Sequence, residues 1–244
     1  MWDNLTLTLV AAISAFLYVW FGVGFGLLAL SIIGFAGTPL AKLVGLILFT
    51  QAIAAIYGSL LRSAGGAKAP RGAPLFVGIS AATAFTVAGA LGVKIADKHR
   101  LLAVAVLLLL AAVVRKPKKM ASVESVDKLL AIGLFAGAVK ALVGGGLTPL
   151  FYIAYRLSGH DFDNAIHRTL VSEVAVCFAA AAPYLLTYSL DPLQLLACLT
   201  GVAIGGLVGL PLRQLEIARE AVARSLMGFL GAMVAVYTLT RNGI

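Results

Sequence analysis

The sequence predicts an all-α polytopic membrane protein. Hydrophobic residues make up 61% of its 244 residues, charged residues only 12%, and the mean hydropathy is +1.02. A typical soluble domain contains a smaller fraction of apolar residues than this. A bilayer-spanning helix needs about 20 apolar residues, and runs that approach this length lie at 43–61, 74–93, 101–114, 165–188, 192–212 and 220–240.

Two further apolar regions, 5–33 and 129–157, are interrupted near their middle by clustered glycines. The first cluster is Gly22, Gly24 and Gly26, and the second is Gly144, Gly145 and Gly146. Helices broken at matching places in two halves of a chain are typical of secondary transporters, whose substrate site lies near the bilayer midplane. We therefore predict that each region is a re-entrant hairpin with its glycines at the apex. The alternative is that the glycines only allow close helix packing, although packing glycines usually recur at every fourth residue.

The distribution of positive charge favours the hairpins. The formal net charge is +9, and lysine and arginine cluster in short segments beside the apolar runs, which indicates cytoplasmic loops rather than a nucleic-acid partner. If all eight apolar regions crossed the membrane, each side would carry nine of these residues. With two hairpins, thirteen lie inside (three in 62–73, five in 115–128, two in 156–168 and three in 213–224) and five lie outside, namely Lys42, Lys94, Lys98, Arg100 and Arg241. Positive residues are enriched on the cytoplasmic side.

The hairpin arrangement also makes the two halves antiparallel, as in an inverted repeat. We expect a first repeat at 1–115, a cytoplasmic linker at 116–128 and a second repeat at 129–244, each repeat being a hairpin followed by three helices. In our alignment Gly24–Leu27 lies opposite Gly144–Leu147. The N-terminus lacks the basic region of a cleavable signal, so we expect the first segment to be retained.

Three stretches carry a resemblance to a known family. They are residues 137–150 (GAVKALVGGGLTPL), a degenerate copy at 22–28 (GVGFGLL) and a glycine-rich run at 201–209 (GVAIGGLVG). This pattern resembles the sulfite exporter TauE/SafE family, also called the toluene sulfonate uptake permease family. The resemblance implies a multispan carrier of sulfite, sulfonates or related organosulfur anions in a prokaryotic plasma membrane. In the first copy only two glycines flank Phe25 and no proline follows, so one or both hairpins can be the binding element.

The second break has chemistry suited to an anion. Consecutive glycines allow positive φ and close backbone approach, and Thr148 followed by Pro149 is a typical helix start. A helix N-terminus at membrane depth offers free N–H groups and a positive dipole end. The alternative to a binding role is that Thr148 and Pro149 only end one helix and start the next. We predict a substrate site formed by Gly24, Gly26, Gln51, Lys140, Gly144, Gly145, Gly146, Thr148 and Arg168.

The ionisable residues inside the predicted helices sharpen this hypothesis. An unpaired Lys140 would cost about 2.5–3.5 kcal/mol at membrane depth, so we expect it to contact a substrate oxygen or Glu173, unless it reaches the surface along its methylene stem. Glu173 is the one carboxylate well inside a predicted span, and we predict that it couples transport to protons, together with His167. Arg168 and His167 can instead anchor the helix at the cytoplasmic interface. Gln51 can line the site or hydrogen-bond another helix.

No pattern in the sequence indicates an enzyme. The histidines lack metal-ligand spacing, and a Walker motif is absent, so we predict neither a metal nor a cofactor. We predict a secondary transporter that works by alternating access, with the lipid bilayer, a small anion and protons as its partners. An anion channel with the same site, and more remotely a membrane enzyme, are the alternatives. The sequence leaves open which anion moves, its direction, proton coupling against uniport, and the oligomeric state.

Overall fold

The computed structural model describes residues 4–35, 40–62, 73–91, 96–113, 126–144, 147–157, 160–209 and 216–242. Within them the chain forms ten helices and no strand. The helices are α1 Asn4–Phe21, α2 Phe25–Phe35, α3 Leu40–Arg62, α4 Ala73–Ala90, α5 Asp97–Val113, α6 Val126–Val143, α7 Leu147–Leu157, α8 Phe162–Thr187, α9 Pro192–Val208 and α10 Glu216–Asn242.

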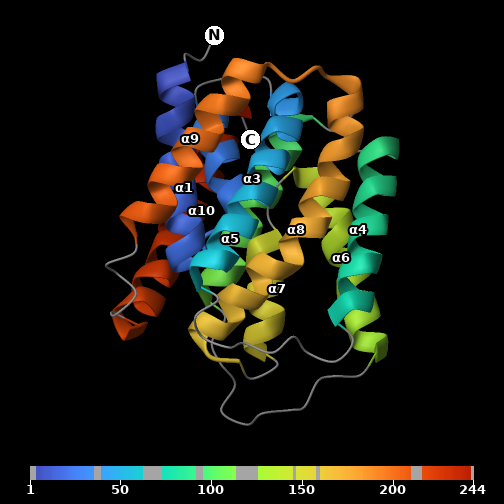
Figure 1. Ribbon diagram of the computed structural model, residues 1–244, viewed down its shortest axis with the longest axis vertical. Helices are drawn as coiled ribbons and strands as arrows, with labels where there is room; N and C mark the ends of the chain where they lie inside the picture. The colour runs from blue at the N-terminus through green and yellow to red at the C-terminus, as the bar shows by residue number, and fades with distance from the viewer. Residues whose placement is uncertain are drawn as a thin grey trace.

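The all-α membrane fold predicted from the sequence is confirmed. Helices α3, α4, α5, α8, α9 and α10 coincide with the six predicted spans to within a few residues at each end. Among the described residues four helical stretches are long and apolar enough to cross a membrane, namely Asn4–Phe21, Leu43–Arg62, Phe162–Thr187 and Ala221–Thr240. Val77–Ala90, Gly133–Val143 and Pro192–Val208 are shorter apolar helices of the same bundle (Figure 1).

Large apolar side chains cover the outside of this bundle. On α1 they recur at every fourth residue, and similar stripes run along α5 and α10. They include Leu5, Leu9, Ile13, Leu102, Val106, Phe229, Met233 and Val236, each at least 44% exposed. Side chains at this spacing share one face of a helix, and an apolar face of this extent is suited to lipid.

Both predicted breaks are present. Residues 22–24 separate α1 from α2, and the segment between Val143 and Leu147 separates α6 from α7. Gly22 has φ +68° and Gly144 has φ +77°, a conformation that glycine adopts without steric cost. Each glycine amide donates to the carbonyl four residues earlier, which closes the last turn of α1 and of α6. The chain can therefore reverse at these two points inside the bundle.

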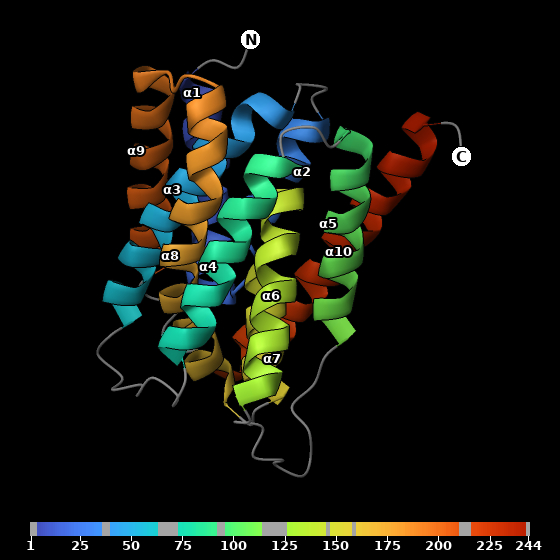
Figure 2. The same ribbon diagram turned by 90° about the vertical axis from the view of Figure 1, so that its right-hand side faces the viewer.

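The short arms that follow the breaks are alike. Both α2 and α7 contain 11 residues, a length of about 16 Å, or half the thickness of the bilayer core. Figure 2 shows α2 toward the end of the bundle that holds the N-terminus, and α7 toward the opposite end. The two broken pairs therefore point in opposite directions.

Helix packing follows the same relation. The first five helices correspond in order to the last five: α1 packs against α9 while α6 packs against α4, and the α3–α8 and α5–α10 contacts map onto themselves. Figure 1 shows α1 and α9 side by side. This exchange supports the inverted repeat that the sequence predicts.

The breaks give the register of the two halves. A Cβ on Gly22 would lie 2.9 Å from the side chain of Ile166, and one on Gly144 would lie 2.6 Å from that of Val44. Positions 22 and 144 are 122 apart, as are 44 and 166. The geometry thus pairs Gly22 with Gly144, so our alignment of Gly24–Leu27 with Gly144–Leu147 was displaced by two residues. Short glycine-rich runs match at several offsets, which is why the sequence misplaced it.

Glycines of the 201–209 run let α9 approach the backbone of α1. A Cβ added to Gly201 would lie 2.3 Å from the Thr8 carbonyl oxygen, and one added to Gly205 would lie 2.1 Å from that of Ala12. Gly137 of α6 faces Ser80 of α4 in the same way, at 2.3 Å. Small residues allow this contact between helices in a membrane.

We expect Gly205→Ala to lower the free energy of unfolding by about 1–3 kcal/mol, because the new methyl group would push α9 away from the backbone of α1. The measurement is the unfolding temperature of the purified protein in detergent. Gly228→Ala is the matched control, since its Cβ would make only an ordinary contact, 3.5 Å from that of Ala112. Equal unfolding temperatures for the two variants would contradict the close approach of α1 and α9.

Candidate functional site

A buried polar cluster surrounds Glu173, near the middle of α8. Its carboxylate contacts Tyr18 from α1, Gln51 from α3, Lys140 from α6 and Thr148 from α7. All five side chains are at most 1% exposed. Both broken helix pairs thus meet the two central helices, α3 and α8, at one carboxylate.

The donors are shared between the two carboxylate oxygens. Glu173 Oε1 accepts from Thr148 Oγ1 at 2.9 Å, from Gln51 Nε2 at 3.1 Å and from Lys140 Nζ at 3.4 Å. Oε2 accepts from Tyr18 Oη at 2.5 Å, and Thr148 Oγ1 is again 2.9 Å away. Lys140 Nζ also donates to Gln51 Oε1 at 2.9 Å, so the amide of Gln51 bridges the ammonium and the carboxylate.

Burying two charges is costly unless hydrogen bonds satisfy them. Here Lys140 and Glu173 neutralise each other, and three neutral donors supply the remaining bonds to the carboxylate. The cluster therefore holds one negatively charged oxygen group, the carboxylate of Glu173, with its charge and hydrogen bonds satisfied.

A constant offset of 122 residues relates most members of the cluster. Tyr18 lies four residues before Gly22 on the last turn of α1, and Lys140 lies four residues before Gly144 on the last turn of α6. The backbone carbonyls of Tyr18 and Lys140 accept hydrogen bonds from the N–H groups of these two glycines. Gln51 and Glu173 are likewise equivalent, 122 positions apart. The first half of the chain contributes the neutral Tyr18 and Gln51, and the second half contributes Lys140, Glu173 and the neutral Thr148.

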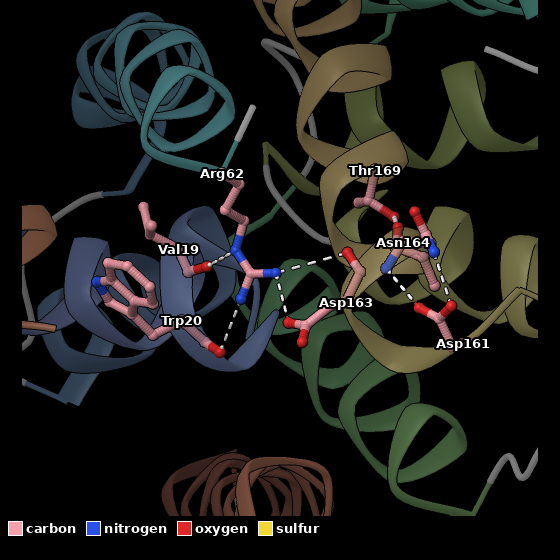
Figure 3. A network of polar contacts seen from close by, with 8 residues as sticks. Val19, Trp20, Arg62, Asp161, Asp163, Asn164 and Thr169 are labelled. Carbon is pink, nitrogen blue, oxygen red and sulfur yellow. Dashed lines mark hydrogen bonds and ion pairs between the residues drawn. The ribbon is translucent and has the colours of Figure 1, made fainter. Parts of the chain in front are cut away.

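Side chains also satisfy the carbonyl groups exposed where α1 ends. Arg62, at the end of α3, donates from Nε to the Val19 carbonyl at 2.8 Å and from Nη2 to that of Trp20 at 3.2 Å (Figure 3). Its Nη1 forms an ion pair with Asp163 Oδ1 at 2.8 Å, at the start of α8. The last carbonyls of a helix need such partners inside a membrane, and a cation also suits the negative end of the helix dipole.

The end of α6 is satisfied in the equivalent way. Tyr184 Oη donates to the Ala141 carbonyl at 2.8 Å, and Arg100 Nη1 donates to that of Leu142 at 2.7 Å. These two carbonyls lie 122 positions after those that Arg62 binds. The topology prediction counted Arg62 and Arg100 as loop charges. In the structure they are only 9% and 1% exposed, and they donate hydrogen bonds to the last carbonyls of α1 and α6.

We expect Arg62→Ala to lower the free energy of unfolding by about 1–3 kcal/mol, because it leaves buried carbonyl groups without a donor. Asp163→Asn removes the ion pair with Arg62 but leaves the carbonyl contacts of Arg62 in place; because the Asp163 side chain is 29% exposed, this loss should cost about 0–1 kcal/mol. Thermal unfolding of both variants in detergent tests this order. A larger loss for Asp163→Asn would show that the ion pair, and not the carbonyl contacts, is the main role of Arg62.

Four of the sequence-predicted residues meet in the cluster: Gln51, Lys140, Thr148 and Glu173. The expectation that Lys140 reaches either Glu173 or a substrate is met by Glu173, and the alternative that it extends to the surface is wrong because the side chain is fully buried. Gln51 hydrogen-bonds other helices and lines the cluster at once.

The other predicted residues lie around the cluster or apart from it. Gly24 is beside Thr148, since a Cβ on Gly24 would lie 3.2 Å from Thr148 Oγ1. Gly144 closes α6 and Gly26 is buried in α2, whereas Gly145 and Gly146 lie outside the described residues. His167 and Arg168 are half-buried in α8, more than one turn before Glu173. The Nε and Nη1 atoms of Arg168 are buried without a hydrogen-bond partner.

Sequence reasoning missed Tyr18. Its signal was its position four residues before Gly22, which matches that of Lys140 before Gly144. Among the described residues, no group of three or more His, Cys, Asp or Glu side chains is placed to hold a metal ion.

A helical membrane bundle with two broken helices around a buried, donor-rich cluster has the architecture of a transporter for a small solute. The family model "Sulfite exporter TauE/SafE" matches residues 7–240, and the chain belongs to this family. The match confirms the resemblance seen in the sequence and makes the chain a multi-pass membrane transporter of sulfur anions. No curated protein and no solved structure matched the chain.

Proposed function

We propose that this protein is a secondary transporter that moves sulfite or a small organic sulfonate, such as sulfoacetate, across a prokaryotic plasma membrane by alternating access. The observation that supports this most is the convergence of Tyr18, Gln51, Lys140 and Thr148 on one buried carboxylate between both broken helix pairs.

The donor set suits a sulfur oxyanion. Sulfite and sulfonates carry three oxygens around one sulfur atom, and ionised oxygens form their strongest hydrogen bonds with cationic and hydroxyl donors. Lys140 supplies the charge, while Thr148 places a hydroxyl group at the start of α7, where backbone N–H groups and the positive dipole end also favour an anion. Gly24, Gly26, Gly144, Gly145 and Gly146 would let the backbone approach the substrate closely.

Alternating access would arise from rocking of the two repeats against each other. The apex at Gly22 packs on Ile166 of the second repeat, and the apex at Gly144 packs on Val44 of the first. Movement at these two contacts would open the cluster toward one end of the bundle or the other. Repeats of opposite orientation around a central site are suited to such a motion.

Arg168 and His167 lie on α8 outside the cluster, and we propose a role for each of them alongside Glu173. Arg168 lies five residues before Glu173 on α8 and carries buried guanidinium atoms without a partner, so it would attract the anion on its way to the cluster. Glu173 is proposed to couple the movement of the anion to protons, with His167 as a second proton site in the same helix.

Flux in liposomes tests the proposal. We expect saturable uptake of sulfite or sulfoacetate that accelerates in vesicles preloaded with the same anion. The same sulfur anions, with thiosulfate and taurine, should raise the unfolding temperature of the wild type and leave that of Lys140→Ala unchanged. Lys98→Ala, which removes an exposed lysine at the start of α5, is the matched control.

Two results would overturn this proposal. Ohmic single-channel currents without saturation or counterflow would identify an anion channel with the same site. If no sulfur anion raises the unfolding temperature of the wild type, or if Lys140→Ala responds as strongly as the wild type, the buried cluster is not the substrate site.

A further inference from the structure

The site already holds an anion, because every donor of the cluster points at the carboxylate of Glu173. A carboxylate and a sulfonate both present delocalised, negatively charged oxygens to the same kinds of donor. The substrate therefore needs the same hydrogen-bond donors that Glu173 already occupies. This inference rests on the proposed function.

We propose that Glu173 is a tethered competitor of the substrate, and that an anion binds only when Glu173 takes up a proton and gives up its donors. The proton comes from the bulk aqueous phase, as a hydronium ion that is left as water, and it converts the carboxylate into a neutral carboxyl group. Lys140 keeps its charge and, with Thr148 and Tyr18, turns to the incoming anion. Binding of each anion is thereby linked to the uptake of one proton by the carboxylate of Glu173.

The charge balance of the cluster is the reason. With Glu173 ionised, Lys140 and Glu173 sum to zero, and an added anion would leave a net negative charge in a fully buried place. Uncompensated buried charge is strongly unfavourable. With Glu173 protonated, the substrate takes the place of the carboxylate as the partner of Lys140, and the site stays neutral.

Among the described residues, Lys140 is the one cation that forms an ion pair with Glu173. Arg168 lies five residues earlier on α8, and Arg156 lies on α7. The groups that face it are Tyr18 from α1, Gln51 from α3, Lys140 from α6 and Thr148 from α7, and Cys177 lies one turn further along α8. Helix α4, which also packs on α8, carries no charged residue between Ala73 and Ala90. In α10 the charged residues lie toward its two ends, at Glu216, Arg219, Glu220, Arg224 and Arg241.

The repeat shows that a neutral side chain fits this position. Gln51, the counterpart of Glu173 in the first repeat, hydrogen-bonds within the same cluster as an uncharged amide. Glutamine has nearly the shape of a protonated glutamic acid. Glu173→Gln therefore mimics the state that we propose to bind substrate.

The test uses methanesulfonate as the probe, because its charge does not change between acid and neutral pH. Calorimetric titration of the full-length wild type in detergent should show affinity that falls as the pH rises, by up to about tenfold per pH unit, with uptake of about one proton per anion. Glu173→Gln should bind at neutral pH at least as tightly as the wild type does in acid, with no proton uptake. Asp191→Asn, which changes an exposed N-cap carboxylate, should behave as the wild type.

Vesicle experiments give a second readout. A proton gradient should drive accumulation of methanesulfonate by the wild type, while Glu173→Gln should retain counterflow and lose the response to the gradient. Wild-type binding that is independent of pH and takes up no proton would overturn the inference, as would weaker binding by a folded Glu173→Gln variant. If that variant does not fold, the proton count of the wild type, measured in two buffers of different protonation enthalpy, decides the question alone.

The outcomes also separate this inference from the proposed function. Binding without proton linkage leaves a sulfur-anion transporter in which Glu173 is only a structural partner of Lys140. Failure of both the wild type and Glu173→Gln to bind methanesulfonate, sulfite and sulfoacetate would contradict the proposed function itself, and with it the competition.

Discussion

Lys140→Met should lower the free energy of unfolding by about 3–5 kcal/mol and abolish stabilisation by sulfur anions. The substitution leaves the carboxylate of Glu173 fully buried without its cation, and breaking one side of a buried ion pair costs this much because the remaining charge is uncompensated. The measurement is the unfolding temperature in detergent, with and without added sulfite or sulfoacetate.

The double variant Lys140→Met with Glu173→Gln separates stability from function. Removing both charges takes away the penalty of the lone carboxylate, so most of the lost stability should return. Transport should not return, because Lys140 is the cation that we propose to hold the anion. A double variant that is as unstable as Lys140→Met alone would show that packing of the lysine stem, rather than its charge, stabilises the cluster.

The helices and the two breaks were predictable because their signals are local. Apolar runs of bilayer length and clustered glycines need no knowledge of the partner helix. Lys140 and Glu173 could also be singled out, since a charge at membrane depth demands a partner wherever the other helices lie. Their mutual contact was one of two alternatives that the sequence left open, and the structure shows it.

Tyr18 and the arginines were harder to interpret, for a physical reason. Tyrosine is common both at the membrane interface and in protein cores, so the residue type alone does not indicate a role for Tyr18. Arg62 and Arg100 entered the topology count as loop charges, yet each donates to carbonyl groups that a break exposes. A helix that ends inside the bundle requires donors for its last carbonyls, and this requirement predicts such residues only after the end of the helix has been placed.

A single offset of 122 residues connects these observations. It pairs Gly22 with Gly144 and also relates Tyr18 to Lys140, Gln51 to Glu173, and Val44 to Ile166. The contributions to the cluster are nevertheless unequal. The first half of the chain supplies the neutral Tyr18 and Gln51, whereas the second supplies the ion pair of Lys140 and Glu173 together with Thr148.

Gly144→Ala should lower the free energy of unfolding by about 2–5 kcal/mol, since two costs act together. Alanine at φ +77° is strained by about 1–2 kcal/mol, and its Cβ would lie 2.6 Å from Val44, an overlap that costs about 1–3 kcal/mol in a packed core. Gly22→Ala should behave similarly, because it combines φ +68° with a 2.9 Å contact to Ile166. Thermal unfolding in detergent and the initial rate of anion uptake are the measurements.

Second-site substitution distinguishes the two costs. Val44→Ala combined with Gly144→Ala removes the overlap but leaves the strained φ, so stability should return in part only. Gly78→Ala in α4 is the control, because a Cβ there meets nothing within 4 Å, and alanine in place of glycine in a helix should stabilise the protein by up to about 1 kcal/mol. If Gly144→Ala unfolds at the same temperature as Gly78→Ala, the chain does not reverse at Gly144 in a left-handed conformation against Val44, and α6 and α7 do not form the broken pair on which the buried site depends.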